Sequence, residues 1–255
     1  MREKMYVVDY EKNLSATEFL YFLECPQKFR IYRLLNPVPF QSAFMSGKRS
    51  QESYQLRGYK GSKWNGLELH NFFEKFHRLY SSKITNENPP EEIQTDNIKV
   101  LYWIIQQEKY LKEKDENYWL PYATEIQLMA EKQRGVVDCL EHIKNKKGLR
   151  IIDYKSKPSI FDKQLLLFYA NLINEYRSEN WDEDQIIFDI EEVGCYYYEL
   201  GIEKIYEIKN SDIQIFKVLL REICEKITNL ELHFEKKSCI GCEYYNICKI
   251  EQKRR

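Results

Sequence analysis

The chain has 255 residues, of which 43% are hydrophobic and 31% charged, an ordinary composition for a globular domain. It has no run of about 18 apolar residues that would cross a membrane, and its first residues, MREKMYVVDYEKN, lack the apolar core of a signal peptide. A net charge of −1 excludes a strong overall attraction to polyanions but leaves room for a local basic face. We therefore expect a cytoplasmic protein with no membrane partner.

The first half of the chain predicts helices. Residues 15–18, with the sequence SATE, form a capping-box pattern that starts a helix. Residues 41–63 are polar and glycine-containing, which predicts a loop. Helices are expected over residues 66–80 and 91–114, and together they predict a helical lobe over about residues 64–120. The first of them has an apolar stripe at helical spacing, formed by Leu69, Phe72, Phe73, Phe76 and Tyr80.

The pattern changes to strands near Tyr122. Apolar alternation predicts strands over residues 125–131, 135–140 and 149–155, and the short intervals between them indicate an antiparallel meander. Residues 161–177 predict a helix that is apolar nearly all round and should pack onto the sheet.

The rest of the chain predicts a hairpin of residues 186–200 and 202–208, and then a long helix over residues 212–232. We expect one α+β domain over residues 1–255, with a central mixed sheet flanked by helices. Its catalytic core would span about residues 121–232, followed by a cysteine-containing segment over residues 233–250.

Seven cysteines without a secretion signal indicate a reducing compartment. Cys239, Cys242 and Cys248 are spaced C-x2-C-x5-C, and Cys25 stands alone near the other end of the chain. We expect the two ends to meet at these cysteines, around a metal or a cluster bound by four thiolates. The spacing alone does not distinguish an iron–sulfur cluster from structural zinc. The remaining cysteines are expected to be inert core thiols: Cys139, Cys195 and Cys224.

Carboxylates and a lysine gather at the ends of two predicted strands. Asp153 and Lys155 are alternate residues of one strand, so their side chains share a face. Asp138 lies on the preceding strand and can meet Asp153 across the sheet. Two carboxylates suit Mg²⁺ or Mn²⁺, and a lysine beside them can orient or deprotonate an attacking water. The tripeptide D-x-K taken alone is also common at surface strand ends that carry an ion pair.

These motifs resemble those of the PD-(D/E)XK nuclease superfamily. Asp138 followed by residues 153–155, DYK, resembles the superfamily signature. Residues 66–70, GLELH, resemble the G-x-x-x-H motif of the RecB-like branch, and residues 135–138, GVVD, resemble its G-x-x-D strand. The cysteines resemble the iron–sulfur subset of that branch, which includes AddB-type helicase–nuclease domains and CRISPR-associated RecB-like exonucleases.

The resemblance implies a restriction-endonuclease-like fold in which an iron–sulfur clasp joins the termini. It implies His70, Asp138 and Asp153 as ligands of Mg²⁺ or Mn²⁺, and Lys155 as the catalytic lysine. It also implies a 4Fe-4S cluster on the four cysteines Cys25, Cys239, Cys242 and Cys248.

One motif departs from the branch pattern. The branch has Q-x-x-x-Y in the helix after the lysine, but here Phe168 stands at that spacing from Gln164, and Tyr169 is one place later. Gln164 and Tyr169 are the candidates for the family role, with a local bulge in the helix as one way to reconcile the spacing. Glu125 is either an aid to a second metal or an exposed strand residue, and His77 is expected to be structural or solvent-facing.

The resemblance implies a metal-dependent DNA exonuclease, with single-stranded DNA ends as the expected substrate. One alternative is a CRISPR-adaptation nuclease that trims DNA ends before spacer integration, and another is a non-catalytic DNA-end-binding subunit. A helicase or a CRISPR integrase complex would then be a separate chain. The expected phosphate contacts are Lys28, Arg30 and Arg33, and the expected base-stacking residues are Tyr32 and Trp64.

Overall fold

The computed structural model describes most of the chain. The described residues are 13–35, 62–86, 88–113, 115–144, 146, 148–180, 189–229, 239 and 242–253. The loop predicted over residues 41–63 falls almost entirely outside these ranges. No helix within them has both the length and the apolar composition needed to cross a membrane.

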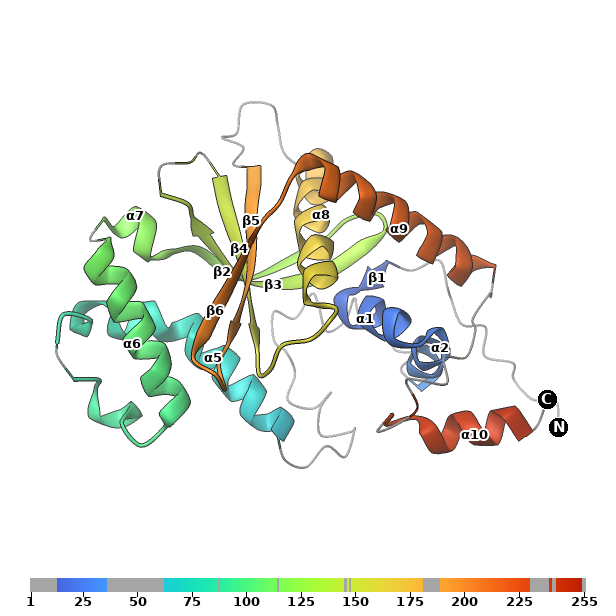
Figure 1. Cartoon of the computed structure of the whole chain (residues 1–255), viewed down its shortest axis with the longest axis horizontal. Coiled ribbons are helices and arrows are strands. Elements are labelled where there is room, and N and C mark those ends of the chain that lie inside the picture. Colours follow the sequence, from blue (N-terminus) through green and yellow to red (C-terminus); the bar gives the residue numbers. More distant parts are fainter. Residues whose placement is uncertain are drawn as a thin grey trace.

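A six-stranded mixed sheet lies at the centre, with helices on both faces (Figure 1). Its strands are β1 (Leu14–Ser15), β2 (Pro121–Met129), β3 (Gln133–His142), β4 (Gly148–Lys155), β5 (Asp189–Tyr197) and β6 (Ile202–Glu207). The order is β1-β3-β4-β5-β6, and β2 also pairs with β3. The pairs β2–β3, β3–β4 and β5–β6 are antiparallel, whereas β4 and β5, on either side of a helix in the chain, are parallel. This confirms the predicted α+β fold with a central mixed sheet.

The helices begin and end close to where the sequence indicates. They are α1 (Ala16–Glu24), α2 (Pro26–Leu35), α5 (Ser62–Tyr80), α6 (Asn97–Lys112), α7 (Glu116–Trp119), α8 (Asp162–Asn180), α9 (Asn210–Thr228) and α10 (Tyr245–Lys253). The predicted capping box is present at α1: the Glu18 backbone N–H donates to the Ser15 hydroxyl, and the Ser15 backbone N–H donates to the Glu18 carboxylate. At Cys25 the backbone is extended, with φ at −167°, and this divides α1 from α2.

Besides a short 3-10 helix at Ser81–Lys83, three elements of the described chain were not anticipated. The strand β1 has two residues, too few to show an alternating pattern, and α7 has four. The short helix α10 begins after Cys239 and Cys242. In addition, α6 starts at Asn97 rather than at residue 91, because the Asp96 carboxylate caps it by accepting hydrogen bonds from the Ile98 and Lys99 N–H groups.

Two hydrophobic cores lie on opposite faces of the sheet. The helices α1, α8 and α9 cover one face, whereas α5, α6 and α7 lie across the other (Figure 1). The first core includes Leu149 and Ile151 of β4, and the second includes Ile152 and Tyr154 of the same strand. The second core is rich in aromatic rings, and Phe73 of α5 packs 4.5 Å from Tyr102 and 4.7 Å from Tyr154 between ring centroids. The apolar stripe predicted for α5 therefore does face the sheet.

Candidate active site

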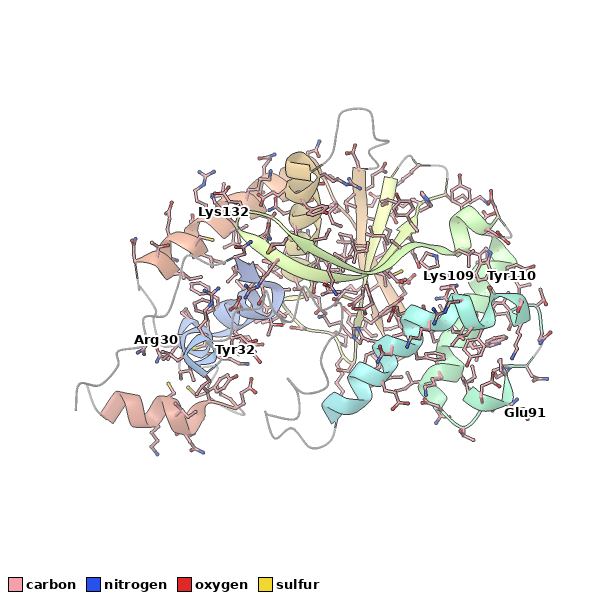
Figure 2. All side chains as sticks on the ribbon, turned by 180° about the vertical axis from the view of Figure 1, so that it is seen from behind. Arg30, Tyr32, Glu91, Lys109, Tyr110 and Lys132 are labelled. Carbon is pink, nitrogen blue, oxygen red and sulfur yellow. The ribbon has the colours of Figure 1, made fainter. Side chains whose placement is uncertain are left out.

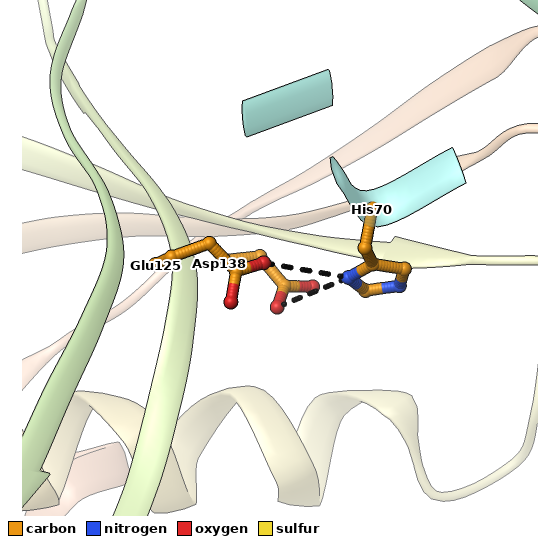
Figure 3. Close-up of side chains that lie close together, drawn as sticks. All are labelled: His70, Glu125 and Asp138. Carbon is orange, nitrogen blue, oxygen red and sulfur yellow. Dashed lines mark ion pairs between the residues drawn. The ribbon is translucent and has the colours of Figure 1, made fainter. Parts of the chain in front are cut away.

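One imidazole and two carboxylates converge at the sheet from three different elements (Figure 3). His70 comes from α5, Glu125 from β2 and Asp138 from β3, and one ligand atom of each lies within 4.8 Å of the others. His70 Nδ1 is 3.5 Å from Asp138 Oδ1 and 3.7 Å from Glu125 Oε1. The Asp138 side chain is 4% exposed, and those of His70 and Glu125 are each 18% exposed. The group is thus largely withdrawn from water but not sealed.

The second core and the sheet fix two of these three side chains. His70 lies on the same helix as Phe73, which is fully buried. The His70 ring meets the Tyr154 ring edge-on, with the two centroids 5.7 Å apart. Asp138 lies within β3, and its Oδ2 accepts a hydrogen bond of 2.9 Å from the backbone N–H of Tyr154 on β4. Ring packing therefore positions His70, and a hydrogen bond from the neighbouring strand positions Asp138.

Glu125 reaches the group through an unusual backbone conformation. It is the one non-glycine residue of the described chain with a positive φ, at 49°. Its neighbours Thr124 and Ile126 pair with Cys139 and Val137, so Glu125 stands opposite Asp138 in the hairpin. A non-glycine residue in this region costs about 1–3 kcal/mol and persists where its surroundings hold it, often at functional sites. Because the Glu125 side chain is only 18% exposed, the alternative of an exposed strand residue is wrong.

Asp153 and Lys155 form a close pair beside this group. The Lys155 ammonium is 2.8 Å from Asp153 Oδ2, which confirms that the two alternate residues share a face of β4. Burial raises the pKa of Asp153 and the charge of Asp138 adds to this, although Lys155 opposes both. Burial disfavours the charge on Lys155, but the attraction of Asp153 outweighs it, and the pKa of Lys155 is raised.

The structure thus brings two of the three predicted metal ligands together and adds a third. His70 and Asp138 meet as expected, and Glu125 joins them. Asp153 is electrostatically coupled to both Asp138 and His70 but points its Oδ2 at Lys155. A sequence signal for Glu125 did exist: the tight β2–β3 turn sets a register in which residue 125 faces residue 138.

The packing of α8, the helix after Lys155, shows where the residues of the irregular Q-x-x-x-Y motif lie. Phe168 is fully buried in the first core, with its ring centroid 5.1 Å from that of Phe19. Tyr169 packs instead on the start of β3: a Cβ added to Gly135 would lie 3.1 Å from its Cε1. Gln164 lies in the first turn of α8, and its buried Oε1 has no hydrogen-bond partner among the described residues. Because α8 is one continuous α-helix over Asp162–Asn180, a bulge does not reconcile the spacing.

The cysteines from the two ends of the chain line one cavity. Cys25, Cys239, Cys242 and Cys248 all border it, together with the side chains Gln27, Lys28, Ile31, Tyr244 and Tyr245. No disulfide joins any two of these four cysteines. Burial raises the pKa of Cys239, and its neighbours Cys25 and Cys242 raise it further, which reflects how close the sulfurs lie.

The three other cysteines behave as core residues. Cys139 is 2% exposed and Cys195 is fully buried, as predicted, while Cys224 on α9 is half-buried. Burial raises the pKa of all three thiols.

A polar contact joins the same two ends without any thiol. The Tyr21 hydroxyl of α1 donates a hydrogen bond of 2.9 Å to Glu243, just before α10. The Lys28 ammonium of α2 lies 3.7 Å from Glu243 and 4.1 Å from the centre of the Tyr21 ring. Glu24 also pairs with Lys28, at 2.6 Å. We call Tyr21, Glu24, Lys28 and Glu243 the latch.

The structure corrects one of the predicted phosphate contacts. Arg33 is 8% exposed and its Nε lies 2.7 Å from Glu18, so it is a buried structural ion pair rather than a phosphate ligand. Lys28 belongs to the latch. Arg30 and Tyr32 lie on α2 (Figure 2), and the Tyr32 ring packs 5.0 Å from that of Tyr21. The Trp64 side chain lies outside the described part of the structure.

Comparison with known proteins identifies a family for this arrangement. The model of the PD-(D/E)XK nuclease superfamily matches residues 13–249 of the chain. The match spans the His70 group, the Asp153–Lys155 pair and all four cysteines of the cavity. A search of curated proteins found no match.

Proposed function

Because the chain belongs to the PD-(D/E)XK nuclease superfamily, we propose that it is a metal-dependent exonuclease acting on single-stranded DNA ends. The observation that supports the nuclease chemistry is the convergence of His70, Glu125 and Asp138 beside the Asp153–Lys155 pair. Superfamily membership and a charged, half-enclosed site together point to phosphodiester hydrolysis.

The donor set fits a small divalent cation. Carboxylate oxygens are the ligands that Mg²⁺ and Mn²⁺ prefer, and an imidazole favours Mn²⁺. His70, Glu125 and Asp138 would hold the ion, with Asp153 beside them on β4. A cation bound there would polarise the scissile phosphate and lower the pKa of an attacking water.

The residues of the chain then have distinct roles. The Tyr154 backbone N–H holds Asp138 in place through a hydrogen bond of 2.9 Å. The Asp153 carboxylate lies 2.8 Å from the Lys155 ammonium and so keeps the positive charge of Lys155 at the end of β4. Lys155 would offset the negative charge that develops on the phosphate oxygens in the transition state.

The position of the site supports a single strand as substrate. The donor groups are recessed, because the Asp138 side chain is 4% exposed and those of His70 and Glu125 are each 18% exposed. A flexible single strand can approach recessed groups more easily than a rigid duplex can. Linear single-stranded DNA should be degraded much faster than covalently closed single-stranded circles, and equal cleavage of the circles would contradict an exonuclease.

Lys155→Ala distinguishes an enzyme from a DNA-end-binding subunit. The variant should bind single-stranded DNA as the parent does but lose the hydrolytic step, because the lysine charge acts mainly in the transition state. Lys112→Ala, which removes an exposed lysine at the end of α6, is the matched control. A parent protein that binds DNA ends without any cleavage in Mn²⁺ would favour the binding subunit.

We further propose that the cysteine cavity holds a 4Fe-4S cluster. Four thiolates suit iron–sulfur clusters and also structural zinc, and the sulfurs come from both ends of the chain. The cluster would be a structural clasp, because hydrolysis needs no electron transfer. Anaerobically purified protein should absorb broadly near roughly 400 nm; one equivalent of zinc and no iron would contradict the cluster.

A site with four thiolate ligands suits a reducing compartment, so we propose that the protein is cytoplasmic. Its partner chain would be a helicase or a CRISPR integrase complex. In the second case the activity would trim DNA ends before spacer integration.

A further inference from the structure

The segment between β4 and α8, residues 156–161, presents an exposed aliphatic side chain close to the proposed active site. Ile160 is 85% exposed, the highest value among the large hydrophobic side chains exposed on the described part of the chain. It follows Lys155 by five residues. Five residues span at most about 18 Å, which is the length of about five stacked nucleotides. Ile160 therefore lies no farther from Lys155 than the length of about five nucleotides.

The segment is a fixed turn rather than a loose loop. Asp162, which is 3% exposed, accepts hydrogen bonds from the Ser159 backbone N–H at 2.7 Å and from the Tyr197 hydroxyl at 2.8 Å. The Ser159 hydroxyl in turn accepts a hydrogen bond from the Phe161 backbone N–H. A side chain on such a turn loses little conformational freedom when it binds, so its contact contributes more to affinity.

A second turn lies at the same edge of the sheet. Because β4 and β5 are parallel, their carboxyl ends lie together, and the Tyr198 backbone N–H donates to the Lys155 carbonyl at 2.9 Å. Lys157 and Glu199 connect the two turns by an ion pair of 3.6 Å. Leu200 on the second turn is 53% exposed. This edge thus offers aliphatic surface and a lysine next to the catalytic strand.

A nucleobase is the ligand whose chemistry fits this edge. The bases of a single strand present flat apolar faces, and aliphatic side chains insert between base steps in DNA-binding proteins. Contacts to base faces tolerate any sequence, as a general exonuclease requires. We propose that Ile160 packs against the face of a base within about five nucleotides of the cleaved phosphodiester and so positions the strand, an inference that rests on the nuclease activity proposed above.

The test is a double-mutant cycle between protein and substrate. One single-stranded oligonucleotide is prepared with a single abasic nucleotide at successive positions from each end. Ile160→Ser should slow degradation of the intact strand about fivefold, at the weak end of base-contact effects. The parent should slow about fivefold when it reaches one abasic position, whereas Ile160→Ser should show no further loss there. Ile160→Leu should restore the parent behaviour.

Ile215→Ser is the matched control, because Ile215 on α9 is 70% exposed and lies on a different element. Its rates should equal those of the parent. The inference is overturned if Ile160→Ser degrades the intact strand at the parent rate, or if it keeps the full abasic penalty. The first result would leave Ile160 as a contact for another protein.

The same cycle is measured as Kd by fluorescence anisotropy without divalent cations. If no variant cleaves DNA but the Kd values show the coupling, the nuclease function fails while the base contact stands. Cleavage without any coupling in rate or Kd overturns the base contact alone. Absence of both cleavage and coupling overturns both.

Discussion

The two candidate ligand sites differ in what holds them together. The ligands His70, Glu125 and Asp138 lie on a long helix and two paired strands, which the hydrophobic cores and strand ladder position. The cysteine cavity is bordered by short helices from the two ends of the chain, with the latch as an additional contact. The first site should keep its geometry without an ion, whereas the second should depend on its ligand for stability.

The largest effect is expected at the sheet-borne site. Asp138→Asn should lower the cleavage rate by about a thousandfold, because several kcal/mol of transition-state stabilisation by the cation would be lost. The melting temperature should stay close to that of the parent. Steady-state cleavage in Mn²⁺ and thermal unfolding measure the two quantities. Asp115→Asn, which changes an exposed aspartate, is the control; an equal loss of rate there would refute a specific role for Asp138.

At the cysteine cavity we expect lower stability and little change in activity. Cys25→Ser should abolish the cluster and lower the melting temperature by about 6–12 °C, the equivalent of about 3 kcal/mol in a chain of this size. Cleavage measured well below the melting temperature should persist. Cys224→Ser, a half-buried thiol outside the cavity, should change neither property. An unchanged melting temperature for Cys25→Ser would show that the latch suffices.

His77, on the helix that carries His70, should make the stability of the folded state depend on pH because its side chain is buried. Burial lowers the pKa of His77 to about 4 from 6.5. The unfolded chain therefore binds an extra proton between these values, and the folded state loses up to about 3 kcal/mol as the pH falls from about 6.5 to 4. His77→Phe should reduce this loss in urea titrations at several pH values. The same pH dependence in His77→Phe and the parent would mean that other groups cause it.

Glu125 is both a candidate metal ligand and a residue with a strained backbone conformation. Glu125→Gln should raise the Mn²⁺ concentration for half-maximal activity by about tenfold, because one anionic ligand is lost. Glu125→Gly should also lose activity but unfold at the parent temperature or above it, because glycine adopts the positive φ of 49° freely. Thr124→Gly, at a neighbouring strand position without positive φ, should cost about 1 kcal/mol. A cost for Glu125→Gly as large as for Thr124→Gly would argue against strain.

The smallest effect is expected at the latch. Tyr21→Phe removes the hydrogen bond to Glu243. This hydrogen bond is exposed to solvent, so it contributes about 1 kcal/mol or less. In cluster-free protein this should speed the reaction of Cys248 with a thiol reagent, since Cys248 is 8% exposed when α10 is docked. Tyr118→Phe, at an exposed position on α7, is the control. Equal labelling rates would show that the latch does not hold the C-terminal segment.

Local patterns in the sequence determined much of this protein. Alternation located β3 and β4, the apolar stripe located the buried face of α5, and the alternate positions of Asp153 and Lys155 predicted that their side chains share a face. These signals succeed because each depends on the period of one helix or strand, which the neighbours along the chain establish.

Tertiary structure decided other features, which the local pattern left open. Arg33 is an ordinary basic helix residue in the sequence, but it is buried against Glu18, fifteen positions away. Phe168 and Tyr169 are adjacent and both aromatic, and only the packing of α8 sends one into the core and the other onto Gly135. Glu125 joins the ligand group because a hairpin register and a strained φ turn its carboxylate toward His70. Each outcome depends on contacts between different helices and strands, where close packing selects one arrangement and the local pattern permits several.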